Sequence, residues 1–189
     1  MVIDMRPSSL PDILDAAMRV LDAADGTDIT YDSVAREAGL TKAGLMYHFP
    51  SKDAMMIAII EHVIARWQDE LQGILEVPLE ESTLRQRVEA FVAFAGSGGA
   101  TPGEFAVFSE AVRRPALSAP WLAYLRTWFD FDTADSDVDG GAGHTALLLV
   151  WLATNGLWIA ESTEILQLTH AERQALTDAL LAIVSKGTP

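Results

Sequence analysis

The chain has 189 residues, half of them hydrophobic, which suits one domain or a small domain packed on a larger one. It contains no cysteine, which excludes disulfide bonds and thiolate metal sites and fits a reducing, cytoplasmic setting. The net charge of −14 argues against attraction of nucleic acid by the overall field, because neutralised phosphates supply much of the affinity of DNA-binding proteins.

Helical patterns dominate the chain, and no alternating strand pattern persists. Four helices are predicted in the N-terminal part, at about residues 10–25, 31–38, 42–48 and 52–75. Oxygen-bearing residues, Thr30, Thr41 and Ser51, cap the last three. Gly39 ends the second helix, because glycine adopts the left-handed conformation at little cost.

Five more helices are predicted in the remainder, at about residues 84–95, 104–113, 121–133, 144–162 and 170–185. The links between them are rich in Gly, Pro or Asp, and Thr169 with Glu172 forms a capping box before the last helix. We therefore expect an all-α protein. A three-helix helix-turn-helix domain at residues 1–53 is joined by the long helix to a C-terminal helical bundle within residues 54–189.

The most apolar stretch, residues 145–160, is short for a membrane span and contains Asn155 and Gly156, so it is better interpreted as a buried helix. The start of the chain lacks the basic and long apolar segments of a signal peptide. A cytoplasmic protein with no membrane partner is predicted. The helix at residues 144–162 is apolar nearly all round, so a second subunit is expected to cover part of it.

The two short helices around Gly39 have helix-turn-helix spacing. Val34 and Ala35 are small enough for the second short helix to cross closely, and Leu45 is expected to bury against them. The exposed side of that helix is then free to enter a major groove. It has suitable polar and close-approach residue types: Lys42, Gly44, Tyr47 and His48. Residues 1–53 carry five basic and nine acidic side chains, a net charge of −4, so any DNA contact must use a local patch.

The stretch ILDAAMRVLDAADG, followed by ITYDSVAREAGLTKAGLMYHFPSKDAMMIAII, resembles the tetracycline-repressor (TetR) family over about residues 10–64. The resemblance implies a homodimer whose paired recognition helices read an inverted repeat in double-stranded DNA. It also implies a C-terminal domain for dimerisation and for a small-molecule effector that releases the DNA. The predicted function is a ligand-responsive transcriptional regulator, a repressor. The alternative is a helical sensor or adaptor that has lost DNA binding, which the acidic charge favours.

Carried over by position, the resemblance implies these DNA-contacting residues: Thr30, Tyr31, Thr41, Lys42, Ala43, Gly44, Tyr47, His48 and Lys52. Thr30 and Lys52 match phosphate contacts, and the residues from Lys42 to Gly44 match base contacts. In one departure, Met46 occupies the place where the family often has a phosphate-binding tyrosine, and Tyr47 follows it. Tyr47 points either into the domain or toward DNA.

The C-terminal region is rich in aromatic residues, and the pairs Trp121/Trp128 and Trp151/Trp158 are each seven residues apart, so each pair shares a helix face. An apolar lining with a few polar groups is typical of a ligand site, although plain core and dimer interface are the alternative. The residues expected to line a site for a small hydrophobic effector are Phe91, Phe105, Phe108, Trp121, Trp128, Trp151, Asn155 and Trp158.

No other group of residues in the sequence predicts a metal site or a catalytic site. Asp135–Gly140 resembles the first half of a calcium loop, but Ala146 stands where the bidentate glutamate belongs, so a plain acidic loop is the alternative. The histidines have no paired metal-ligand spacing, and no Ser/His/Asp set, nucleophile elbow or phosphate loop is visible. The sequence therefore predicts no enzyme, no cofactor and no metal site. The second alternative, a helical enzyme that uses the acidic residues of the C-terminal bundle, has no catalytic set to support it.

Overall fold

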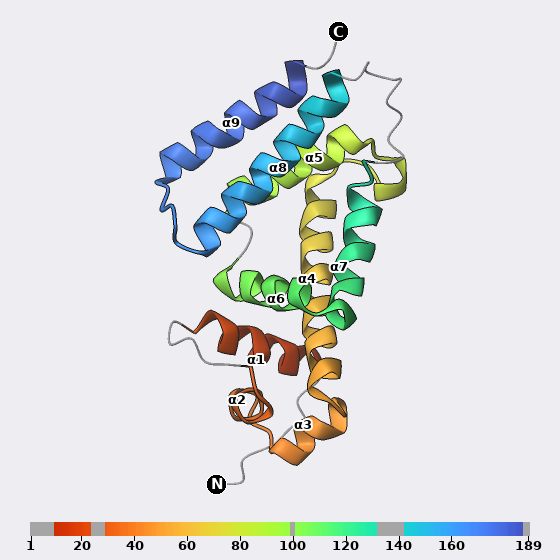
Figure 1. The fold of residues 1–189 in the computed structure, drawn as a ribbon, viewed down its shortest axis with the longest axis vertical. Helices are drawn as coiled ribbons and strands as arrows, with labels where there is room; N and C mark the ends of the chain where they lie inside the picture. The colour runs from red at the N-terminus through yellow and green to blue at the C-terminus, as the bar shows by residue number, and fades with distance from the viewer. Residues whose placement is uncertain (1–9, 24–28, 99–100, 132–141, 187–189) are drawn as a thin grey trace. The chain divides into compact units, whose positions relative to one another are not determined.

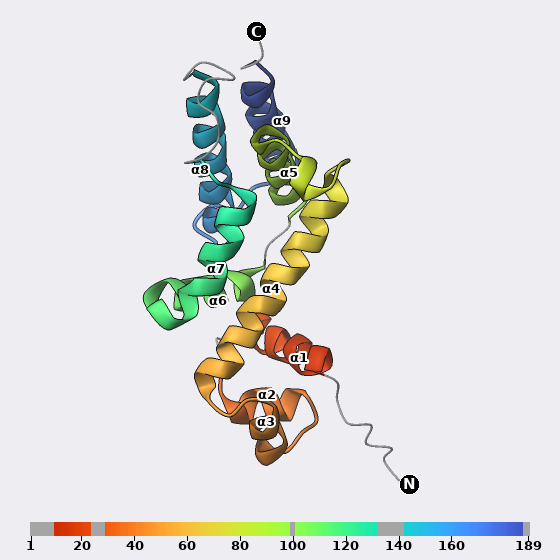
Figure 2. The same ribbon diagram turned by 90° about the vertical axis from the view of Figure 1, so that its right-hand side faces the viewer.

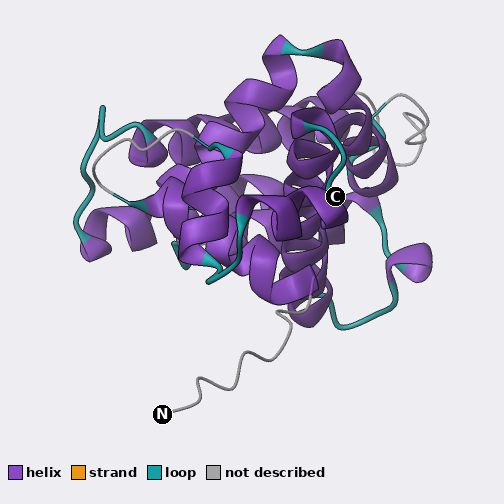
Figure 3. Cartoon of the chain, turned by 90° about the horizontal axis from the view of Figure 1, so that it is seen from below, coloured by secondary structure: helices purple, strands orange, loops and turns teal. Residues whose placement is uncertain are grey.

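The computed structural model describes residues 10–23, 29–98, 101–131 and 142–186, and these residues form helices and connecting loops (Figure 3). The fold is all-α, as predicted. Figure 1 shows the elements in chain order. They are α1 (Leu10–Asp22), α2 (Tyr31–Glu37), α3 (Lys42–His48), α4 (Lys52–Ile74), the short 3-10 helix η1 (Leu79–Glu81), α5 (Leu84–Gly96), α6 (Pro102–Arg113), α7 (Pro115–Trp128), α8 (Ala142–Ser162) and α9 (His170–Lys186).

The chain divides into two compact units. The first contains residues 1–64 and 102–120, and the second contains residues 65–101 and 121–189. Two helices pass from one unit to the other: α4 after Ile64, and α7 after Pro120. The boundary that the sequence predicts after residue 53, between a DNA-binding domain and a domain for ligand binding and dimerisation, stays a prediction.

In the first unit, α1 packs against α2 and α6, and α2 packs against α3 (Figures 1 and 2). Helix α1 is strongly amphipathic and buries one face, which includes Ile13 and Ala17. The core of this unit also contains side chains from every other helix in it, among them Val34, Leu45, Met55, Ile59, Val107, Ala111 and Leu117. Removing such apolar area from water stabilises the unit by roughly 25 cal/mol per Å².

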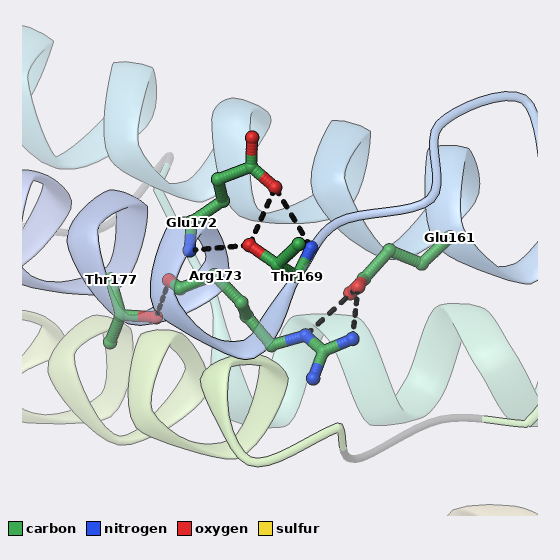
Figure 4. A network of polar contacts seen from close by, with 5 residues as sticks. All are labelled: Glu161, Thr169, Glu172, Arg173 and Thr177. Carbon is green, nitrogen blue, oxygen red and sulfur yellow. Dashed lines mark hydrogen bonds and ion pairs between the residues drawn. The ribbon is translucent and has the colours of Figure 1, made fainter.

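In the second unit, α5 packs against α8 and α9, and α8 packs against α9 (Figures 1 and 2). The predicted capping box holds the start of α9. The backbone N–H and the hydroxyl of Thr169 donate to Glu172 at 2.9 and 2.7 Å, and the Glu172 backbone N–H donates back to the Thr169 hydroxyl (Figure 4). These bonds lower the pKa of the Glu172 carboxyl. Arg173 then pairs with Glu161 and ties α9 to α8, with Nη2 and Oε1 2.5 Å apart.

The prediction for the seventh helix was wrong at both ends. The sequence placed a loop before Trp121 and continued the helix to Thr133, whereas α7 begins at Pro115 and ends at Trp128. Proline is tolerated in a first turn, where the missing N–H would have no helical partner. At the other end, Arg87 donates to the carbonyls of Thr127 and Trp128 and so replaces the next helical turn. Helix α6 begins at Pro102, two residues earlier than predicted, and η1 was not predicted.

Candidate DNA-binding surface and aromatic core

Local hydrogen bonds fix the helix-turn-helix. The Thr30 hydroxyl accepts from the Ser33 backbone N–H at 3.0 Å, and the Thr41 hydroxyl accepts from the Gly44 backbone N–H at 3.0 Å. Between the two helices, Gly39 has φ +68°, and the N–H of Leu40 returns to the Ala35 carbonyl at 2.8 Å. The two threonine caps and the glycine stop are therefore confirmed.

Buried apolar contacts orient α3. Leu45 is fully buried, as are Val34 and Ala35 of α2, as predicted. Tyr31 adds a hydrogen bond between the two helices: its hydroxyl donates to the carbonyl of Phe49 at 2.7 Å and so links the start of α2 to the end of α3. This hydroxyl is thus engaged within the unit, and a DNA contact by Tyr31 stays a prediction.

The side of α3 away from Leu45 is open to solvent. Lys42, Ala43 and His48 are exposed, and Gly44 is partly exposed. Tyr47 is 89% exposed, so the interpretation of Tyr47 as a core residue was wrong. Outside the helix, Thr30, Thr41 and Lys52 are also exposed. All predicted DNA-contacting residues except Tyr31 and Gly44 are therefore exposed; their contacts with DNA stay predictions.

The exposed cations of this unit lie among carboxylates. Lys42 Nζ is 2.8 Å from Asp32 Oδ2, and Arg19 Nε is 2.7 Å from Glu37 Oε1. Lys52 forms no ion pair with any residue that the structure describes. The first unit therefore offers local positive groups, two of which, Lys42 and Arg19, already have an acidic partner on α2.

Helix α6 belongs to the same unit and is fastened at both ends, which the sequence did not reveal. The Gly103 N–H donates to Asp22 Oδ1 of α1 at 3.0 Å. Just after the other end of α6, Arg114 Nη2 lies 2.5 Å from Asp53 Oδ1 in the first turn of α4, directly behind α3. The hydrogen bond and charge of Asp53, together with those of Glu110, raise the pKa of the Arg114 guanidinium. A displacement of α6 would therefore pull on both α1 and the start of α4.

The second unit contains a network of aromatic rings. Trp67 of α4 contacts Phe94, Trp121, Tyr124 and Trp158, with ring centroids 5.3 to 6.4 Å apart. A second group surrounds Phe129, whose ring centroid lies 5.2 to 6.3 Å from those of Phe91, Tyr124, Trp128 and Trp151. Edge-to-face and tilted pairs of this kind favour a tightly packed core.

The predicted ligand-lining residues are divided between the units. Phe91, Trp121, Trp128 and Trp158 are buried in the second unit, and Trp151 is half-buried there. Phe105 and Phe108, by contrast, lie on α6 in the first unit. The sequence selection omitted Trp67, Tyr124 and Phe129, although their contacts make them central to the network. Whether any of these residues binds a ligand stays a prediction.

Asn155 satisfies its amide locally, because Nδ2 donates to the Trp151 carbonyl one turn earlier at 2.8 Å. Within the described residues, no three His, Cys, Asp or Glu side chains form a group that could hold a metal. The acidic segment Asp135–Gly140 lies outside the described residues.

Helices α8 and α9 leave apolar side chains exposed in the second unit. They are Leu149, Leu152 and Ile159 on α8, and Leu176 and Ile183 on α9. Helix α8 is also long and apolar enough to cross a membrane by length and composition alone. Only 28% of its most apolar window is buried, so the prediction that residues 145–160 form a buried helix was wrong for the single chain. In a chain of this fold, an uncovered apolar face favours a protein partner.

Two family profiles match the chain. Residues 13–59 match the description "Bacterial regulatory proteins, tetR family", and residues 81–185 match "Tetracyclin repressor-like, C-terminal domain". The chain belongs to the TetR family. It is therefore a DNA-binding transcriptional regulator, and the resemblance inferred from residues 10–64 is confirmed.

Individual relatives agree. The HTH-type transcriptional regulator EthR of Mycobacterium tuberculosis is 26% identical over 149 residues, which are 75% of this chain and 67% of EthR. BetI of Brucella canis, also named an HTH-type transcriptional regulator, is 26% identical over 91 residues, 48% of this chain and 44% of BetI. These relatives are named as regulators and not as enzymes.

Solved structures share the fold. A transcriptional regulator from Rhodococcus sp. Rha1 aligns with TM-score 0.68 and 16% identity over 95% of this chain and 97% of that chain. The multidrug binding protein EbrR, complexed with malachite green, aligns with TM-score 0.60 and 17% identity over 97% of this chain and 99% of that chain.

Proposed function

We propose that this TetR-family protein is a cytoplasmic repressor that binds an inverted-repeat operator as a homodimer and is released from it by a small hydrophobic effector. The observation that carries the proposal is the contrast within α3: Leu45 is fully buried, whereas Lys42, Tyr47 and His48 are exposed. A helix held by its inner face, with cationic and hydrogen-bonding side chains outside, suits insertion into a major groove.

Two lysines have distinct proposed roles. Lys42, in the first turn of α3, is in the position to reach base edges, whereas Lys52, at the start of α4, suits a phosphate contact. A base contact discriminates between sequences, whereas a phosphate contact contributes affinity without sequence information.

The exposed stripe of α8 and α9 supports the homodimer. Burying a leucine or isoleucine side chain that is now exposed stabilises an interface by roughly 1.5–3 kcal/mol. Two copies that pair through α8 and α9 would cover these side chains with the same surface on each subunit, which is the usual arrangement in a two-fold symmetric dimer.

The aromatic network of the second unit supports an effector site. Its rings offer a large apolar surface, and several carry a polar N–H or O–H. The ligand acts by binding the DNA-free conformation more tightly than the DNA-bound one, typically by about 1–3 kcal/mol.

A mobility-shift assay with the DNA upstream of the protein's own gene tests the proposal. Lys52→Ala is expected to weaken all DNA about equally and to reduce the slope of log affinity against log salt by about one unit. Lys42→Ala is expected to alter the preference among operator variants. Arg126→Ala, which removes an exposed cation of the second unit, is the matched control and is expected to change neither.

The alternative function is a sensor that has lost DNA binding, which the net charge of −14 favours. If the wild-type protein fails to shift upstream DNA at low salt, or if both lysine variants bind like the wild type, the alternative stands and the assignment of α3 as a reading helix is wrong.

A further inference from the structure

The Arg87 Nε and the Ser162 hydroxyl of the second unit are buried without a partner among the described residues, and so are three donors on aromatic side chains. The aromatic donors are the Tyr124 hydroxyl and the indole N–H groups of Trp128 and Trp151, none of which has a partner in the part of the chain that the structure describes. Tyr124 is 4% exposed and Trp128 is 1% exposed. Buried polar groups in native proteins are nearly always paired, so three unpaired donors in one region require an explanation.

The three aromatic rings that carry these donors all contact one further ring, that of Phe129. Tyr124, Trp128 and Trp151 each contact Phe129, with centroid distances of 6.3, 6.3 and 6.1 Å, and Phe91 covers Phe129 as well at 5.2 Å. This Phe129 cluster combines apolar ring surface with donors and contains no acceptor side chain that is ionised. Burial also raises the pKa of Tyr124, which keeps its hydroxyl protonated and able to donate.

We propose that the effector is an uncharged, mainly apolar molecule with a hydrogen-bond acceptor, such as a carbonyl oxygen, that accepts from the Tyr124 hydroxyl in the Phe129 cluster. This inference rests on the proposed function and names the class of its effector. Acceptors match the unused donors, whereas a molecule with only donors leaves them unpaired at a cost in affinity.

The surroundings of the Phe129 cluster also bear on whether a charged effector could bind there. A cation in this cluster would lose its hydration and would gain only cation–π contacts with the rings, because the cluster itself supplies no carboxylate. The cation next to the cluster is Arg87, whose Nη groups already donate to the carbonyls of Ser82, Thr127 and Trp128. Asp130 acts on the same guanidinium and opposes the lowering of its pKa by desolvation. The Nη groups of Arg87 are thus committed to Ser82 and to the end of α7, and only its buried Nε has no partner among the described residues, so the anionic probe below tests whether Arg87 can hold an anion.

The test uses four probes that share two phenyl rings: benzophenone as the neutral acceptor, diphenylmethane without a polar group, diphenylacetate as the anion and diphenylmethylammonium as the cation. Binding to the full-length protein is measured by tryptophan fluorescence and calorimetry. We expect benzophenone to bind more tightly than either charged probe. Tyr124→Phe should weaken benzophenone about tenfold, as expected for one hydrogen bond to a desolvated donor, and change diphenylmethane less than twofold.

Tyr47→Phe is the matched control, because it removes a phenol hydroxyl that is exposed in the first unit. It should leave all four affinities unchanged. In the ligand-free protein, Tyr124→Phe should keep or raise the melting temperature, since it removes a buried group without a partner. A drop of several degrees would mean that the hydroxyl already has an acceptor, and that result overturns the inference.

Three further results overturn it: tighter binding of the ammonium or the carboxylate probe, equal loss of benzophenone and diphenylmethane in Tyr124→Phe, or no binding of benzophenone at all. Operator binding, measured in parallel by mobility shift, separates this failure from failure of the proposed function. A protein that binds its operator but prefers a charged probe refutes only the effector class.

Discussion

The ion pair between Lys42 and Asp32 predicts that this protein binds DNA more weakly than its recognition helix allows. Lys42 Nζ lies 2.8 Å from Asp32 Oδ2, so Lys42 must leave Asp32, or share it, to reach a base or a phosphate. Asp32→Asn removes this competition and one negative charge from α2 while it keeps the size of the side chain. We therefore expect Asp32→Asn to bind the operator more tightly than the wild type.

The exposure of the pair limits the size of the gain. The two side chains are 55% and 69% exposed, and pairs with this solvent access contribute about 0.2–1 kcal/mol. Releasing Lys42 should therefore raise operator affinity by a factor of about 1.4 to 5, since 1.4 kcal/mol corresponds to a factor of ten. The gain should shrink at high salt, where exposed charges are screened and the pair is already weak.

Mobility shifts or fluorescence anisotropy across a salt series measure this effect. Asp69→Asn is the control: it changes the net charge equally, but Asp69 is exposed on α4 in the second unit. The decisive comparison is a double-mutant cycle with Lys42→Ala. If Asp32→Asn raises affinity just as much when Lys42 is absent, or if Asp69→Asn has the same effect, the gain comes from overall charge and the reasoning is refuted.

Two further predictions concern packing. Leu152→Glu, on the exposed stripe of α8, should convert the proposed dimer into monomers in sedimentation at micromolar concentration and abolish tight operator binding, whereas Leu122→Glu, at a comparably exposed leucine of α7, should do neither. A dimer that survives Leu152→Glu would rule out this face. Gly103→Ala should lower the melting temperature, because the added Cβ would lie 2.4 Å from Asp22 Oδ1 and 3.1 Å from the Asp22 backbone N. Overpacking of this kind destabilises by about 1–3 kcal/mol, which exceeds the gain in helix propensity of up to about 1 kcal/mol. Gly73→Ala, with nothing within 4 Å, should be stabilising, and equal effects at the two glycines would contradict the α1–α6 contact.

The sequence predicted features that depend on neighbouring residues. The caps at Thr30 and Thr41 and the stop at Gly39 rest on contacts between residues three to five positions apart, so the order of residues determines them. The fully buried Leu45 followed from the same local geometry, because it faces the small residues of α2. A recognisable family pattern then supplied the function.

The sequence could not predict how distant segments meet. Gly103 and Asp22 are 81 positions apart, and Arg114 and Asp53 are 61 apart, so no periodicity reveals that α6 belongs to the DNA-binding unit. The same limit applies to Phe105 and Phe108, which lie in the first unit: composition identifies aromatic residues but does not say which core receives them, and their part in a ligand site stays a prediction. Tyr124 was not selected for the predicted ligand site, because its unpaired hydroxyl becomes evident only once its burial is known.

The distribution of charge explains how an acidic chain can still read DNA selectively. Lys42 and Arg19 each pair with a carboxylate, while Arg36 and Lys52 are exposed without an ion-pair partner among the described residues. Exchanging an exposed carboxylate for a phosphate costs about 1 kcal/mol or less, so a correctly placed operator loses little affinity. On DNA without the operator sequence, the same carboxylates repel phosphates, and no base contact compensates. We therefore expect the acidic groups beside α3 to reduce non-specific binding more than binding to the proposed operator, which would raise the ratio on which selection of one site in a genome depends.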